Sequence, residues 1–258
     1  MPKWKRILIT FGAAVIVVGI YMSFFGVQTV GALMVRYQYR KTPEMNKTPA
    51  HLTDLSISAV PHKKVSYFGY EFELPSDDVD DQKSKTTGAI RVTTFQSGNA
   101  LWFSAFPPKS FVNTIVKDLT LDARQFKQLY GEEAFESDYV FHREILGATP
   151  SDITPFISRS RAVSGMTLLL LKMMSMPKAD SGIFTIRAPG FEGFQFESPK
   201  GRPFKIVDEL YSPDEGIDVI FFQKGGGSAP DISQPEINRV IQSIHRVTNS
   251  SATPAPLN

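Results

Sequence analysis

The chain has 258 residues and a formal net charge of +2, but the positive charge is unevenly distributed. Outside the bases that flank an N-terminal apolar segment, acids outnumber bases, so the remainder has no overall attraction to phosphate backbones and nucleic acid binding is not expected. The chain has no cysteine. This excludes disulfides, thiolate metal sites and a cysteine nucleophile. The flanking bases are Lys3, Lys5, Arg6, Arg36, Arg40 and Lys41.

The N-terminal apolar segment covers residues 7–35 and contains no charged residue. As a helix it would extend about 43 Å, more than the roughly 30 Å hydrocarbon core of a bilayer. A secretory apolar region is about 7 to 15 residues long and ends at a cleavage site. The length therefore predicts a retained transmembrane anchor, preceded by a basic tip at residues 1–6.

The bases on the two sides of this segment nearly cancel as an orientation signal. Because long domains translocate largely regardless of their charge, we expect the C-terminal domain to be extracytoplasmic, at the inner membrane if the source is bacterial. The expected partners are the lipid bilayer, through residues 7–35, and a protein of the membrane or envelope. Gly19 and Ser23 form a small-xxx-small pair, which is compatible either with a weak homodimer through the anchor or with lipid-facing residues.

Residues 36–62 contain several prolines among small polar residues and are predicted to be a spacer. The predicted domain covers residues 63–247, followed by a disordered tail at 248–258. Alternation of apolar and polar residues predicts a strand at 68–74. Two further strands, at 89–96 and 99–106, are expected to form a hairpin around Ser97-Gly98.

The middle of the chain has helical signals. An apolar stripe from Phe111 to Leu119 predicts one helix, and Asp122 with Gln125 forms a capping box for a second helix that ends at Tyr130. Residues 137–147 and 150–158 are also expected to be helical. Residues 162–174 are apolar but too short to span a membrane, and they predict a buried helix.

The last third of the domain returns to strands. We expect hairpins from residues 183–187 with 193–197, and from 204–211 with 217–223, followed by a helix at 234–245 capped by Ser233 and Glu236. The predicted fold class is α+β: an N-terminal transmembrane helix, then one domain with a mainly antiparallel sheet covered by helices.

An opening aromatic strand with Gly69, Phe72 and Pro75 at three-residue spacing, followed by hairpins and a closing helix, resembles the PsbP/Mog1-like α/β sandwich domains. The resemblance covers the order of elements over residues 63–247. It implies a binding or assembly module, often attached to a membrane complex, and it implies no catalytic residue.

Three residues are the candidates for acid-base catalysis. Asp138 and His142 are four apart on a predicted helix, so a carboxylate can lie beside an imidazole, and Glu144 is close in sequence. An ordinary surface pair is the alternative. No serine lies in the context of an activated nucleophile, and Gly225 to Gly227 lack the order of a phosphate loop, so no cofactor is expected.

Asp77, Asp78, Asp80 and Asp81 form an acidic loop, which is the candidate metal site. A calcium loop that began at Asp78 would place Lys83 where glycine is required. A solvated acidic loop is the alternative to calcium binding.

Two functional hypotheses follow. The first is an anchored binding or assembly module, which predicts an exposed apolar or aromatic patch that includes Trp102. The second is an anchored, hydrolase-like enzyme, which predicts a concave pocket that gathers Asp138, His142 and Glu144. The absence of a complete catalytic motif favours the module, although the sequence does not exclude an enzyme.

Overall fold

The computed structural model describes residues 19, 21–23, 26–60, 62–175, 182–197, 204–222 and 232–247. The predicted α+β class is confirmed. An eight-stranded sheet has the order β1-β7-β8-β9-β10-β6-β5-β4, and a second sheet has the order β11-β3-β2. β1 runs parallel to β7, whereas the other neighbours in the large sheet are antiparallel. The strands are β1 (Ala50–His51), β2 (Lys64–Tyr67), β3 (Tyr70–Glu73), β4 (Lys85–Thr87), β5 (Ile90–Thr94), β6 (Ala100–Phe106), β7 (Ile183–Ala188), β8 (Phe191–Glu197), β9 (Phe204–Tyr211), β10 (Gly216–Phe222) and β11 (His245–Arg246).

The single strand predicted at residues 68–74 differs from the structure. Phe68 and Gly69 form the turn of a hairpin between β2 and β3, with φ values of 52° and 85°. Positive φ at both central residues is the requirement of a type I′ turn, which suits the twist of paired strands. Phenylalanine rarely adopts a positive φ. The alternation of apolar and polar residues also continues through Phe68 and Gly69, so the sequence gives no sign of the turn.

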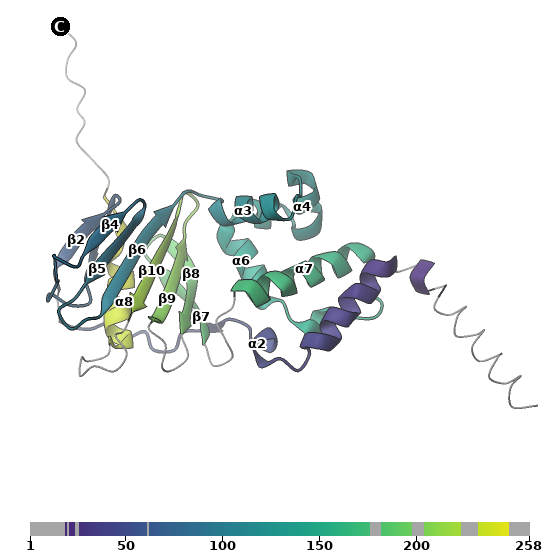
Figure 1. Cartoon of the computed structure of the whole chain (residues 1–258), viewed down its shortest axis with the longest axis horizontal. Helices are drawn as coiled ribbons and strands as arrows, with labels where there is room; N and C mark the ends of the chain where they lie inside the picture. The colour runs from purple at the N-terminus through teal and green to yellow at the C-terminus, as the bar shows by residue number, and fades with distance from the viewer. Residues whose placement is uncertain are drawn as a thin grey trace, which may run out of the picture.

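The helices after β6 form a group of their own, which we call the helical lobe. Figure 1 shows α3, α4, α6 and α7 beside one another and away from α8, which lies with the strands. The helical lobe has its own core, in which Phe126 and Phe141 are fully buried. The capping box of Asp122 and Gln125 is present as predicted. The helices are α2 (Pro43–Asn46), α3 (Ser110–Asp118), α4 (Ala123–Tyr130), α5 (Glu132–Glu136), α6 (Asp138–Gly147), α7 (Arg159–Ser175), α8 (Gln234–Ser243) and the short 3-10 turn η1 (Pro150–Asp152).

The prediction of a transmembrane helix at residues 7–35, and of a signal-anchored single-pass membrane protein, is contradicted. None of the helices within the described residues is long and apolar enough to cross a bilayer. Residues 7–18, 20, 24 and 25 of the predicted segment lie outside the described residues. The physical reason is visible in its second half, where the chain forms a helix over residues 26–39 that packs against α7, with Ala32 fully buried. Uncharged residues here make a helix–helix contact within the protein.

Lys172 connects this part of the chain to the helical lobe. Its side chain, on α7, is fully buried, and its Nζ donates to the carbonyl oxygens of Lys47 and Ala148, both at 2.6 Å. Burial lowers the pKa of Lys172 to about 8. Lys172 therefore holds the segment after α2 and the end of α6 together.

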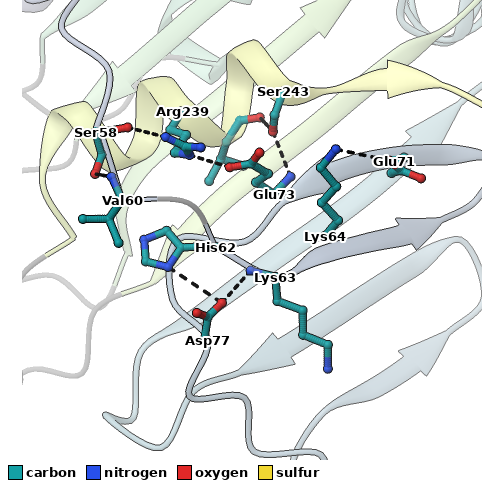
Figure 2. A network of polar contacts seen from close by, with 11 residues as sticks. Ser58, Val60, His62, Lys63, Lys64, Glu71, Glu73, Asp77, Arg239 and Ser243 are labelled. Carbon is teal, nitrogen blue, oxygen red and sulfur yellow. Dashed lines mark hydrogen bonds and ion pairs between the residues drawn. The ribbon is translucent and has the colours of Figure 1, made fainter.

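The residues predicted to be a spacer, 36–62, include the end of the first helix, α2 and β1. After β1 the chain crosses α8, where Arg239 donates to the backbone oxygen of Ser58 and to the carboxylate of Glu73 (Figure 2). Ser243 adds a second link, since its Oγ accepts from the backbone N–H of Glu73 at 2.8 Å and donates to the backbone oxygen of Val240. The segment is thereby fixed between α8 and β3.

The two faces of the large sheet are covered differently. One face, which we call the α8 face, packs against α8 and the β2–β3 hairpin in an aromatic core where Phe72 stacks on Phe103, with ring centroids 4.7 Å apart. The opposite face, the α6 face, contacts α6 through Leu146, Phe194 and Phe196. The helices were predicted to cover the sheet, but most of the helical lobe lies beyond it (Figure 1). The α6 face is where the polar groups gather.

Candidate functional site

Strand register places a row of polar residues across the α6 face. Glu209 on β9 lies opposite Asp218 on β10, which lies opposite Ser104 on β6. On the other side Glu209 faces Phe194 of β8. Gly193 supports this arrangement, because a Cβ at that position would collide with the backbone carbonyl of Glu209. Two carboxylates are therefore fixed side by side by backbone pairing alone.

His142 of α6 contacts this row of polar residues. Its Nδ1 lies 2.9 Å from the hydroxyl oxygen of Tyr211 and 3.0 Å from Oε2 of Glu209. The Tyr211 hydroxyl donates to the same Glu209 oxygen at 3.0 Å. Since that carboxylate accepts only, the network assigns the proton on His142 to Nδ1. We call His142, Glu209, Tyr211, Asp218 and Ser104 the polar cluster.

Burial changes the acidity of the polar cluster. The pKa of Asp218 is raised to about 7, first by burial and then by the charge of Glu209, while a hydrogen bond with Ser104 opposes the shift. Burial also raises the pKa of Tyr211 well above its ordinary value, and Glu209 adds to the effect. The Tyr211 hydroxyl thus stays a hydrogen-bond donor at any physiological pH.

The surroundings of His142 decide what this cluster can do chemically. The side chain is 3% exposed, and its Nε2 has no hydrogen-bond partner within the described residues. The imidazole stacks on Phe111 at 5.0 Å between centroids and meets the edge of Phe194 at 5.3 Å. A general base needs its open nitrogen within hydrogen-bond reach of a substrate or nucleophile. Here the imidazole is buried among aromatic rings, and its hydrogen bonds join α6 to β9.

Of the three residues predicted for acid-base catalysis, Asp138 and His142 lie one turn apart on α6 and both contact Phe111, whereas Glu144 has other neighbours. Asp138 accepts hydrogen bonds from the backbone N–H of Val112 at 2.9 Å and of Phe111 at 3.3 Å. It therefore caps α3, whose own N-cap residue provides no side-chain bond. Glu144 has different charged neighbours, Arg143 and Glu133 of α5. Burial raises its pKa, the charge of Glu133 adds to this shift, and the charge of Arg143 opposes it.

The acidic loop after β3 uses its carboxylates to hold its own turns. Asp78 accepts from the backbone N–H of Ser97 at 3.1 Å, and the Asp80 carboxylate accepts from both the backbone N–H and the Nζ of Lys83. Asp77 accepts from the backbone N–H of Lys63 and lies near His62 (Figure 2). Asp81 completes the turn that follows Asp80. Within the described residues no group of three or more His, Cys, Asp or Glu side chains could hold a metal ion.

Beyond the polar cluster, the side chains of the α6 face on β10, β6 and β5 are half-buried or exposed. The next cross-strand row on the same face consists of Val207, Ile220, Trp102 and Val92. Trp102 is 38% exposed and packs on Phe222, with ring centroids 4.6 Å apart. We call the open area the apolar patch; its residues are Ile90, Val92, Trp102, Ile220 and Phe222.

Sequence reasoning found part of this region. Trp102 was named as a candidate for an exposed patch, and His142 as a candidate polar residue. Glu209, Tyr211 and Asp218 were missed, although the inward alternation of β9 and β10 puts their side chains on one face. That pattern alone did not reveal that α6 would meet them.

No protein-family model and no curated protein sequence matches the chain. The function therefore has to be inferred from the geometry of the chain itself.

Proposed function

We propose that the protein is a binding or assembly module that docks a partner protein on the apolar patch. The observation that carries the proposal is the position of Trp102, which is 38% exposed in the middle of an ordered sheet. A tryptophan held by rigid strands is a typical anchor of protein interfaces, because it buries a large area at a small entropic cost. Ile90, at 40% exposure, extends the same surface.

The border of the patch indicates the chemistry of the partner. Asp218 lies two residues before Ile220 on β10, so its carboxylate is on the same face, beside Glu209. The two acids meet without a lysine or arginine in the polar cluster. A partner with apolar side chains and a neighbouring lysine or arginine would supply the missing positive charge, and it would favour the ionised form of Asp218.

The acid-base alternative has less support. Asp138 is engaged in capping α3, the imidazole of His142 is buried among aromatic rings, and Glu144 has other neighbours. A cavity does exist near α6, but it is lined by Tyr139 and Arg143 and by none of the three candidates. The resemblance to PsbP/Mog1-like domains, which stays a prediction, agrees with a module.

Site-specific crosslinking tests the proposal. A photo-reactive amino acid replaces Trp102 in the full chain, and in a second version it replaces Phe156, an exposed aromatic residue of the helical lobe. We expect one discrete crosslinked partner from position 102 in cells and none from position 156. The substitution Trp102→Glu should abolish co-purification of that partner, whereas Phe156→Glu should retain it. Identical products from both positions would contradict the proposal.

A further inference from the structure

A groove of about 1010 Å³ lies along β7, toward the opposite end of the large sheet from the apolar patch. Its walls come from the segment at residues 51–57, which we call the strap, and from β7, α6 and α8. Its volume is at the upper end of the range typical of small-molecule sites. Apolar side chains form much of its surface: Leu52, Leu55, Ile57, Tyr139, Ile186 and Ile241.

The strap is held by its backbone and leaves its apolar side chains uncovered. Nδ2 of Asn238, on α8, donates to the carbonyl oxygens of Asp54 and Ser56, both at 2.8 Å. Leu55 and Ile57 line the groove and are 73% and 53% exposed. Two large apolar side chains are thus fixed at the opening of a cavity, where a hydrocarbon group would remove them from water.

The charged groups of the groove have one sign. Arg143 and Arg187 are both exposed at its rim, and none of the lining residues is acidic. Arg143 lies over the ring of Tyr139 at 5.7 Å, which orients it. Arg187 pairs with Glu192 at 3.1 Å, but both side chains are largely exposed, so this ion pair is weak. The rim therefore favours an anion.

We propose that this groove binds a long-chain carboxylate. The hydrocarbon chain would lie against Leu55, Ile57 and Ile186, and the carboxylate would meet the guanidinium group of Arg143 or Arg187. Guanidinium and carboxylate groups match in geometry and form paired, charge-assisted hydrogen bonds. The proposal is independent of the apolar patch, because the two surfaces share no residue.

Headgroup selectivity tests the proposal on the unmodified full chain. Dodecanoate, dodecanol and dodecyltrimethylammonium are titrated by calorimetry below their micellar concentrations. We expect dodecanoate to bind about tenfold more tightly than either comparison compound, since only its headgroup pairs with arginine. Octanoate should bind more weakly than dodecanoate, because its shorter chain buries less apolar area. Equal affinity for the three dodecyl compounds overturns the proposal. Binding of an extended peptide in the groove, with no binding of any of the three compounds, also overturns it.

Three variants localise the binding. Arg143→Gln and Arg187→Gln should each weaken dodecanoate binding about fivefold and leave dodecanol binding unchanged. The matched control is Arg124→Gln on α4, outside the groove. These arginines are exposed, so the melting temperature should be unchanged and a loss of binding cannot be attributed to unfolding. Unchanged dodecanoate affinity in both groove variants overturns the proposal. Trp102→Glu should retain dodecanoate binding, which separates failure of this inference from failure of the docking proposal.

Discussion

The two faces of the eight-stranded sheet use the same strands for different purposes. On the α8 face, Phe103, Val219 and Leu210 are fully buried against α8 and the β2–β3 hairpin. On the α6 face, consecutive positions of the same strands carry Trp102, Asp218 and Glu209, of which none is fully buried. Because side chains alternate along a strand, each strand supplies the core with one set of residues and the surface with the other.

Stability and recognition are assigned to different faces of the sheet. The α8 face is closed by apolar packing, which is non-directional and tolerates no solvent. The α6 face is closed over β8 and β9 by α6 and the polar cluster, and it is open over β10, β6 and β5. Substitutions on the first face should therefore affect folding strongly, whereas those on the open part of the second should affect mainly binding.

Two adjacent residues of β6 should differ most in their contribution to the free energy of unfolding. Phe103→Ala should lower the free energy of unfolding by about 3–5 kcal/mol, because it removes a buried ring that stacks on Phe72 and leaves a cavity. Trp102→Ala, one position earlier, should cost no more than about 1 kcal/mol, since its ring is already partly in water. Urea denaturation of both variants measures the difference. Similar losses from the two substitutions would show that the α6 face is also core.

Much of the fold was predictable from local signals. The capping boxes at Asp122 and Ser233, and the hairpin around Ser97-Gly98, are confirmed because their chemistry is contained in a few residues. The turn at Phe68 was not predicted, because nothing in the sequence indicates that this phenylalanine adopts a positive φ. The transmembrane prediction failed for a related reason: an uncharged helix reads the same whether lipid or another helix covers it.

The candidate site was less predictable. His142 could be singled out as a titratable residue on a helix, but its partners Glu209 and Tyr211 lie more than sixty positions later in the chain. Their meeting depends on the register of β9 and on the way α6 packs on Phe194 and Phe196, and neither follows from local pattern. Trp102 was predictable because one alternating strand decides which way it points.

The next largest change in stability is expected at Asp208, a carboxylate buried in the α8 face. Burial raises the pKa of Asp208 well above its ordinary value, the charge of Glu209 adds to this, and neither carboxylate oxygen has a hydrogen-bond partner within the described residues. The folded state therefore keeps a proton that the unfolded chain loses near pH 4. The stability from this group is full below pH 4 and is lost as pH rises toward the folded pKa, at about 1.4 kcal/mol per pH unit.

Asp208→Asn should remove that dependence. Urea denaturation from pH 5 to 8 should show the variant gaining in stability over the natural protein as pH rises. Asp218→Asn is the matched variant on the α6 face, where the same sign applies but the change ends near the folded pKa of about 7. An Asp208→Asn variant whose stability parallels the natural protein at every pH would mean that the carboxylate is solvated, and the contrast between the two faces would be weaker than the burial indicates.

The smallest effect tests whether the polar cluster fastens α6 to the sheet. Tyr211→Phe keeps the ring that packs near Phe106 but removes the hydroxyl that donates to Glu209 and contacts Nδ1 of His142. We expect a loss of about 1–2 kcal/mol in the free energy of unfolding, the usual cost of a buried hydrogen bond with a charged acceptor. Hydrogen exchange should quicken selectively in α6.

Tyr139→Phe is the control for that experiment, because Tyr139 lies on α6 and stacks on Phe194. It loses a hydroxyl outside the polar cluster and should change the free energy of unfolding by less than about 0.5 kcal/mol. If Tyr211→Phe proved as mild as Tyr139→Phe, apolar packing of Leu146 and Phe196 alone would hold α6 in place. The two faces would then differ only in how much of each is covered, and the acids beside the apolar patch would be available entirely for a partner.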